Sequence, residues 1–241
     1  TPVIDWQGKP YDKATATTPA AHPNSRFTVS AKQNPAYSHL MEHPEGVPIS
    51  AILFGGRRRE VAPLVYEARD WAHGVMIGAG MASETTAAAV GQVGIVRRDS
   101  MAMKPFCGYN FADYWSHWLS FEGRAKQLPK VYHVNWFRQD KDGKFLWPGF
   151  GDNLRVLSWI IDRCEGRAHA KETPIGFLPR PEDIDLKGLN LPESSLHQLL
   201  DLDTAAWHVE IDDIGKYLES YGARMPQQLK DKHRQVQQAL G

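Results

Sequence analysis

One run of the sequence, residues 130–166, constrains the fold more than any other, because it joins a strand pattern to a helix pattern through a loop. Residues 130–135 (KVYHVN) predict a buried strand. Residues 153–164 repeat apolar side chains at helical spacing, with Asp152 or Asn153 available as the N-cap. The apolar side of this helix is predicted to consist of Leu154, Leu157, Ile160, Ile161 and Cys164. A strand that leads into a helix in this way indicates a fold of layered sheet and helices.

Strand and helix patterns alternate along most of the chain. Strands are predicted at residues 47–54, 64–66, 75–77 and 93–96, and a helix at residues 110–121. That helix carries an aromatic side, which we interpret as a core face rather than a binding site, made of Phe111, Tyr114, Trp115, Trp118 and Leu119. The alternation predicts an α/β or mixed α+β fold.

The C-terminal part is predicted to contain a proline-rich, acidic connection and then two terminal helices. The first of these helices has an amphipathic face of Trp207, Ile211, Ile214, Leu218 and Tyr221. The second has Pro226 at its first position and a narrow apolar edge of Leu229, Val236 and Leu240. The expected architecture is therefore a mixed sheet with flanking helices and two C-terminal helices.

The overall charge balance argues against nucleic acid and acidic membranes as partners. Lys plus Arg and Asp plus Glu number 28 each, so no overall field favours nucleic acid or an acidic membrane. No apolar run approaches the roughly 18 residues that a membrane-spanning helix needs. Cys107 and Cys164 show neither zinc nor CxxC spacing, so a reducing, cytoplasmic compartment is the simpler expectation, with a single disulfide left open.

The loop between the predicted strand and the predicted helix, residues 136–152, mixes large aromatic side chains with turn formers and charges. Its aromatic residues are Trp136, Phe137, Phe145, Trp147 and Phe150. Aromatic side chains in an irregular segment must be buried under neighbours or kept for a flat ligand. We interpret this loop as the binding site of a flat polar heterocycle.

The strand predicted at residues 47–54 is followed by Gly55, Gly56 and three arginines, Arg57, Arg58 and Arg59. The glycines allow the backbone to approach an anion that the guanidinium groups could hold. An exposed turn with basic side chains is an equal alternative. A Walker loop is excluded, because GxxxxGK[ST] occurs nowhere in the sequence.

Two further segments each admit two readings. Residues 22–27 (HPNSRF) predict a turn stiffened by proline, and Asn24 and Arg26 on it are either solvated or part of a site. Residues 78–91 are small residues bounded by glycines. They predict either a short helix capped at Ser83 or a mobile lid.

These motifs occur together in one order: residues 22–27, 54–58 (FGGRR), 83–89 (SETTAAA), 105–111 (PFCGYNF) and 135–153. In order and spacing they resemble the C-terminal part of GTP-dependent phosphoenolpyruvate carboxykinase, from about Trp6 to the end of the chain. The resemblance implies conversion of oxaloacetate and GTP to phosphoenolpyruvate, carbon dioxide and GDP. It also implies that residues 1–46 are the tail of the phosphoenolpyruvate-binding subdomain and that residues 47–241 are part of the GTP-binding domain.

The resemblance implies a role for each motif. Asn24, Ser25 and Arg26 would contact oxaloacetate or phosphoenolpyruvate, and Arg57 would approach the terminal phosphate of GTP. The guanine site would consist of Phe137, Phe145, Phe150, Gly151 and Asn153, with the phenylalanines as walls and Asn153 reading the polar edge of the base. The lid would include Ser83, Glu84, Thr85, Thr86, Ala87, Ala88 and Ala89.

The sequence also departs from the family pattern. Ala82 stands where animal members usually carry arginine, and residues 90–93 (VGQV) replace a more charged part of the lid. The histidines show no spacing typical of metal ligands. The resemblance implies that the phosphate-binding loop and the Mn²⁺ ligands lie upstream of Thr1, that no metal ligand lies in this chain, and that Mg²⁺ accompanies GTP.

The expected parent protein is a monomeric cytoplasmic enzyme, and the chain alone is expected to be an inactive fragment of it. A stand-alone purine-nucleotide binding or regulatory module is the alternative. A nucleic-acid role for Arg57, Arg58 and Arg59 is the weakest hypothesis, because three basic residues at zero net charge attract a polyanion poorly.

Overall fold

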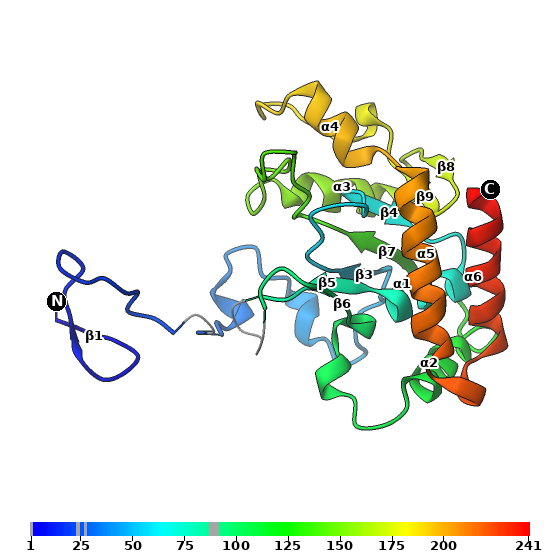
Figure 1. The fold of residues 1–241 in the computed structure, drawn as a ribbon, viewed down its shortest axis with the longest axis horizontal. Coiled ribbons are helices and arrows are strands. Elements are labelled where there is room, and N and C mark those ends of the chain that lie inside the picture. Colours follow the sequence, from blue (N-terminus) through cyan, green and yellow to red (C-terminus); the bar gives the residue numbers. More distant parts are fainter. Residues whose placement is uncertain (1, 23–24, 27, 87–91) are drawn as a thin grey trace. The chain divides into compact units, whose positions relative to one another are not determined.

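The structure, a computed structural model, describes residues 2–22, 25–26, 28–86 and 92–241. The chain divides into two units, one formed by residues 1–48 and 85–95 and the other by residues 49–84 and 96–241. The first unit contains a short antiparallel pair, β1 (Val3–Ile4) and β2 (Pro10–Tyr11). The second unit, which we call the sheet unit, contains the other strands and all the α-helices of the described residues (Figure 1).

The centre of the sheet unit is a five-stranded sheet in the order β3-β7-β4-β9-β8. Its strands are β3 (Ala51–Gly55), β4 (Val65–Glu67), β7 (Lys130–Val134), β8 (Lys171–Thr173) and β9 (Gly176–Leu178). Strands β3 and β7 are parallel, and the remaining pairs are antiparallel. The sheet is therefore mixed, as predicted. A separate antiparallel pair joins β5 (Ala82–Glu84) to β6 (Val96–Arg98).

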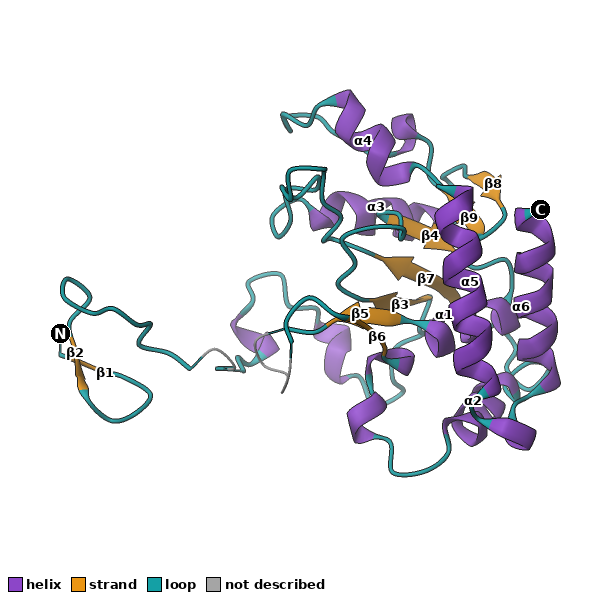
Figure 2. Ribbon diagram, viewed as in Figure 1, coloured by secondary structure: helices purple, strands orange, loops and turns teal. Residues whose placement is uncertain are grey.

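Helices cover both faces of the sheet (Figure 2). They are α1 (Trp71–Gly80), α2 (Phe111–Leu119), α3 (Asn153–Cys164), α4 (Glu193–Leu200), α5 (Thr204–Glu219) and α6 (Gln227–Leu240). Successive side chains of β7 pack on opposite faces of the sheet, because side chains alternate along a strand. Val131 packs into the cluster formed with α1, α2, α5 and α6, whereas Tyr132 packs into the cluster formed with α3 and α4.

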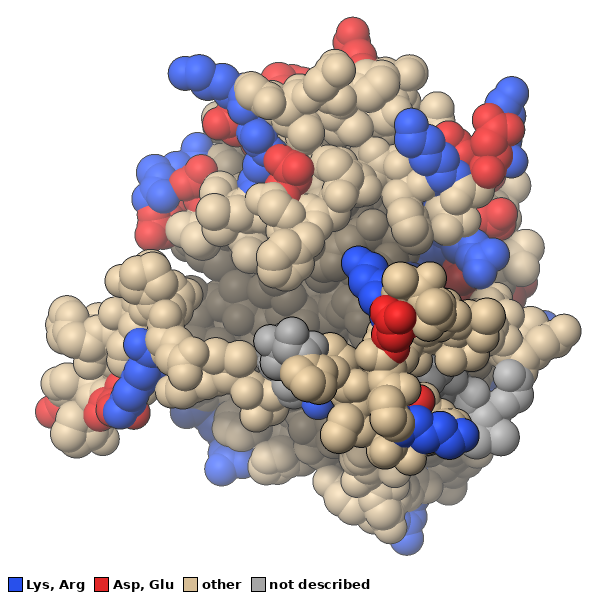
Figure 3. Space-filling model, turned by 90° about the vertical axis from the view of Figure 1, so that its left-hand side faces the viewer, with Lys and Arg blue, Asp and Glu red and all other residues tan. Residues whose placement is uncertain are grey.

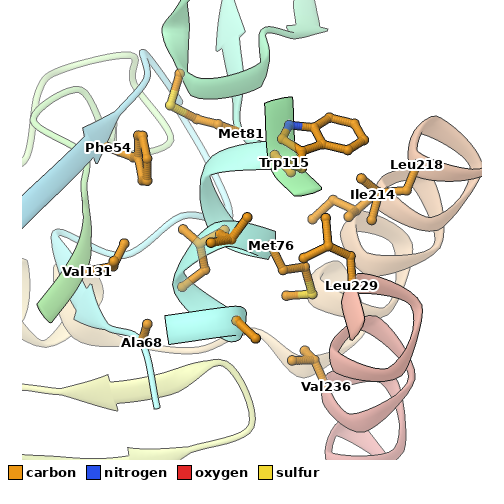
Figure 4. Packing of buried hydrophobic residues seen from close by; sticks show 14 of the residues in the cluster. Phe54, Ala68, Met76, Met81, Trp115, Val131, Ile214, Leu218, Leu229 and Val236 are labelled. Atoms are coloured by element: carbon orange, nitrogen blue, oxygen red, sulfur yellow. The ribbon is translucent and has the colours of Figure 1, made fainter. Parts of the chain in front are cut away.

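Helix α1 is the central element of the first of these clusters. Figure 4 shows it between Phe54 and Val131 of the sheet on one side and Ile214 and Leu229 of α5 and α6 on the other. Its glycines permit this approach, since a Cβ at Gly78 would lie 2.6 Å from the Phe54 ring. All ten residues of α1 are buried.

The strand predicted at residues 75–77 is wrong, because these residues lie in α1. Amphipathic periodicity is the usual mark of a helix, and a helix buried on every side lacks it. The helix considered at Ser83 is also wrong, since Ala82–Glu84 form strand β5. The strand predicted at residues 93–96 occurs later, as β6 over Val96–Arg98.

Helices α3 and α6 lie where the sequence predicts helices, but the buried residues of α3 and the first residue of α6 differ from the prediction. In α3 the buried residues are Val156, Trp159 and Ile160, whereas Leu154 and Ile161 of the predicted apolar side are exposed. Pro226 is the N-cap of α6 rather than its first residue. The predicted connection after residue 166 contains β8, β9 and α4, which the sequence did not indicate.

The predicted core faces of α2, α5 and α6 are confirmed in their main residues. In α2, Phe111, Trp115 and Leu119 are buried, and Tyr114 and Trp118 pack against them partly exposed. The predicted residues of α5 and α6 that are buried are Trp207, Ile211, Ile214, Leu218, Leu229, Val236 and Leu240. Acidic and basic side chains lie interspersed on the face drawn in Figure 3.

Candidate functional site

The aromatic loop after β7 is held in a hairpin by its own turn. Gln139 and Phe145 form an antiparallel bridge. The Asp140 carboxylate accepts hydrogen bonds from the backbone N–H groups of Asp142 and Lys144, both at 2.9 Å. Gly143 occupies the left-handed region at φ +77°, which the turn requires. The hairpin brings the Phe137 and Phe145 rings within 6.2 Å, in an edge-to-face arrangement.

A cavity of about 580 Å³ opens between this hairpin and the start of α3. Its lining residues are Trp136, Phe137, Lys144, Phe145, Trp147, Pro148, Gly149, Phe150 and Asn153. The volume lies within the roughly 300–1,000 Å³ typical of small-molecule sites. Phe150 is 98% exposed, so its ring is almost free of neighbours, and Phe145 is 48% exposed, so about half of its surface remains open to a ligand. Exposed aromatic rings around an apolar cavity suit a flat ligand.

The structure brings together four of the five residues predicted for the guanine site, since Phe137, Phe145, Phe150 and Asn153 all line the cavity. Gly151 lies in the turn directly before α3 and is not among the lining residues. The predicted guanine site did not include Trp136, Lys144 and Trp147, although all three lie in the loop interpreted as a heterocycle-binding site. Both tryptophans are in the aromatic loop, so the same aromatic signal could have included them.

Trp147 forms the inner wall of the cavity. Its side chain is only 1% exposed. The indole Nε1–H donates a hydrogen bond of 2.9 Å to Oδ1 of Asn153, the first residue of α3. This bond ties the aromatic loop to the helix.

The arginine loop, residues 55–59, begins at the last residue of β3 and lies against β5. A Cβ at Gly56 would come within 2.2 Å of the Ala82 carbonyl oxygen, so only glycine permits this approach. Both backbone polar groups of Arg57 bond to β5. Its N–H donates to Oγ of Ser83 at 3.0 Å, and its carbonyl accepts from the N–H of Glu84 at 2.9 Å.

Two of the three arginines in this loop are paired with carboxylates. Both guanidinium NH groups of Arg58 contact Glu210 of α5, at 2.8 and 2.7 Å. Arg59 donates from its backbone N–H and its Nε to Glu84, both at 2.8 Å. The sequence did not single out Glu210, because it lies 152 residues from Arg58 and no local pattern joins the two.

Arg57 differs from its two neighbours. No ion pair among the residues that the structure describes includes Arg57. Its guanidinium carbon lies 4.0 Å from the centre of the Phe137 ring, a cation–π contact. A positive charge without a carboxylate therefore lies against one wall of the aromatic cavity. A ligand with a flat ring and an anionic tail matches this pair of features.

Glu210 also binds a fourth arginine, Arg98 of β6, at 2.8 Å. Burial alone would raise the pKa of Glu210, but the hydrogen bonds and positive charges of Arg58 and Arg98 outweigh it and hold the pKa at about 2. Glu210 is therefore ionised at neutral pH. It fixes the arginine loop to α5 and to the β5–β6 pair.

The predicted lid residues fall into three groups. Ser83 and Glu84 belong to β5 and are bonded to the arginine loop. Thr85 belongs to the first unit, where its N–H donates to the Ile95 carbonyl at 2.9 Å, and Thr86 follows it there. Ala87, Ala88 and Ala89 lie outside the described residues. The lid role stays a prediction.

The residues predicted to contact oxaloacetate or phosphoenolpyruvate lie in the first unit. Asn24 is outside the described residues. Ser25 and Arg26 are exposed, and the Ser25 N–H donates to the His22 carbonyl at 2.8 Å. Arg57, predicted to approach the terminal phosphate of GTP, belongs to the sheet unit, and the roles of Arg26 and Arg57 both stay predictions.

Within the described parts of the chain, no three His, Cys, Asp or Glu side chains lie together in a way that could hold a metal ion. The same parts of the chain include no helix long and apolar enough to cross a membrane.

Comparison with known proteins identifies the family. The family profile described as "Phosphoenolpyruvate carboxykinase C-terminal P-loop domain" matches residues 1–239. The chain belongs to this family, and its mixed α/β architecture agrees with the family domain.

Similar curated proteins carry the name phosphoenolpyruvate carboxykinase [GTP]. The protein from Chlamydia caviae is 52% identical over 240 residues, which are 99% of this chain and 40% of that protein. The protein from Anaeromyxobacter dehalogenans strain 2CP-1 is 52% identical over 227 residues, 94% of this chain and 38% of that protein. The chain thus spans about 40% of the length of the curated relatives that it matches.

Proposed function

We propose that this chain supplies the guanine-binding part of a GTP-dependent phosphoenolpyruvate carboxykinase. The whole protein would convert oxaloacetate and GTP to phosphoenolpyruvate, carbon dioxide and GDP. The observation that carries the proposal is the aromatic cavity with Arg57 beside it, a cation that forms no ion pair with the residues that the structure describes. The names of the relatives, phosphoenolpyruvate carboxykinase [GTP], agree with this reading.

In this proposal the base and the phosphates of GTP bind to different elements. The purine enters the cavity between Phe137, Phe145 and Phe150, and Asn153 bonds to its polar edge. Arg57 neutralises charge on the phosphate chain, because phosphoryl transfer depends mainly on positioning and charge neutralisation. The backbone bonds of Arg57 to Ser83 and Glu84 support this role, since they leave its side chain to meet a ligand.

The remaining predicted residues would act on the second substrate. Asn24, Ser25 and Arg26 would hold oxaloacetate or phosphoenolpyruvate, and residues 1–46 and 47–241 would correspond to the two predicted domain parts. Loss of carbon dioxide from oxaloacetate leaves an enolate. A lid that includes residues 83–89 would protect the enolate from protonation by water until it is phosphorylated.

The family also implies divalent metals, which we propose are Mn²⁺ at the reacting centre and Mg²⁺ with GTP. We assign no step to them, because the described residues of this chain offer no ligand set. We further propose that the whole protein is a monomeric cytoplasmic enzyme of gluconeogenesis.

Substitution of the cavity walls in the full-length protein tests the proposal. Phe137→Ala and Phe150→Ala should each weaken GTP binding by the roughly 1–3 kcal/mol seen when a base loses an aromatic stacking partner. Leu154→Ala is the matched control, because Leu154 is an exposed apolar residue four positions after Phe150 that does not line the cavity. GTP affinities equal to the parent's in both phenylalanine variants would contradict the proposal. Tight GTP binding without carboxykinase activity in the full-length protein would favour a nucleotide-binding module instead.

A further inference from the structure

The hydrogen bond between Trp147 and Asn153 determines which way the Asn153 amide is turned. An indole N–H can only donate, so its partner in the amide must be the carbonyl oxygen. The 2.9 Å distance from Nε1 of Trp147 to Oδ1 of Asn153 satisfies this requirement. The Nδ2 amino group is then the part of the amide that remains for other partners.

Trp147 is held firmly enough to impose this orientation. Its side chain is 1% exposed and packs in the cluster that includes Val156, Trp159 and Ile160 of α3. A side chain packed in this way has little rotamer freedom. The Asn153 oxygen cannot turn toward the cavity without leaving the indole N–H buried and unbonded, which would cost the free energy of desolvating that group.

The cavity therefore presents hydrogen-bond donors at Asn153. Nδ2 carries two N–H groups, and neither donates to another side chain or backbone group in the part of the chain that the structure describes. Guanine has a carbonyl oxygen at position 6, which accepts, whereas adenine has an amino group there, which donates. At position 6, donors on the protein therefore match guanine and oppose adenine.

We propose that Trp147 is a positioning residue for base selectivity: it fixes the Asn153 amide so that the cavity favours purines with an oxygen at position 6. This inference rests on the proposed nucleotide site and adds a determinant to it. Trp147 acts through Asn153, so its removal should change the choice of base more than the strength of stacking.

The test is Trp147→Phe in the full-length protein, with the affinities for GTP and ATP measured by calorimetric titration. Phenylalanine retains an aromatic wall and removes the N–H donor. The amide of Asn153 can then turn its oxygen to the cavity, and the ratio of GTP to ATP affinity should fall about tenfold, the scale of one hydrogen bond. A second variant, Asn153→Asp, removes the Nδ2 donors and should reduce GTP affinity more than ATP affinity.

Trp159→Phe is the matched control. Trp159 is 2% exposed in the same cluster, but its indole donates to the backbone carbonyl of His169 and it does not line the cavity. It should lose stability and keep the parental GTP to ATP ratio. An unchanged ratio of GTP to ATP affinity in Trp147→Phe would overturn the inference. If Trp147→Phe fails to fold, equal losses of GTP affinity and ATP affinity in Asn153→Asp would overturn it. Failure of the parent protein to bind GTP would instead refute the proposed function.

Discussion

The carboxylate of Glu210 offers the sharpest prediction about stability. Glu210 accepts hydrogen bonds from Arg58 and Arg98, and the three side chains are only 11%, 9% and 8% exposed. The substitution Glu210→Gln keeps the size of the side chain and removes its charge. Two buried guanidinium groups then lie close together without the carboxylate that they share.

The expected loss of stability in Glu210→Gln follows from two separate arguments. Removing one partner of a buried ion pair typically costs about 3–5 kcal/mol, because a charge is left buried and uncompensated. The fall of the Glu210 pKa from 4.5 to about 2 corresponds to about 3 kcal/mol of stability at neutral pH. Arg98 retains a second partner, Asp213, at 2.6 Å, which favours the lower end of the range. We expect Glu210→Gln to lose about 3 kcal/mol.

Urea unfolding at pH 7 measures this loss, with Asp213→Asn as the control. Asp213 binds the same Arg98 but is 63% exposed, so its loss should cost less than about 1 kcal/mol. The pH dependence provides a second check. Because the folded pKa of Glu210 is depressed, its contribution is complete above pH 4.5 and disappears as the pH falls toward 2. A loss in Glu210→Gln no larger than in Asp213→Asn would refute this account of the cluster.

Two further predictions concern the core. Gly78→Ala should destabilise by about 1–3 kcal/mol, because its Cβ would lie 2.6 Å from the Phe54 ring, whereas Gly108→Ala, with no atom within 4 Å, should be nearly neutral in thermal unfolding. Burial lowers the pKa of both His73 and His133 to about 4, so both should be neutral when folded. Stability should therefore fall as the pH drops from 6.5 toward 4, and His133→Phe should reduce that slope; an identical slope in the variant would contradict this assignment.

The sequence predicts correctly those helices and strands whose apolar positions coincide with the faces that they bury. Strand β7 and helix α2 have apolar positions that match the faces they bury, so both were placed almost to the residue. Residues 75–77 of helix α1 carry a strand pattern, because neighbours surround the helix and no polar side marks its period. In α3 the sequence selected Leu154 and Ile161, but the sheet packs on the side that carries Val156 and Trp159.

The residues of the candidate site also fall into two groups: those in one local segment, which the sequence predicts, and those joined by long-range packing, which it does not. Phe137, Phe145, Phe150 and Asn153 lie in one local segment, and the structure places them around one cavity. Glu210 could not be predicted, because its pairing with Arg58 depends on how α5 packs within the sheet unit. The bond between Trp147 and Asn153 spans only six residues, yet it depends on the path of a loop without periodicity.

A structure of the full-length protein with bound GDP would be the most direct test of the proposed guanine site. We expect the guanine ring in the cavity against Phe137 and Phe150, with Nδ2 of Asn153 bonded to the oxygen at position 6 and the Trp147–Asn153 bond retained. A base bound elsewhere, with Phe150 still exposed to solvent, would contradict it.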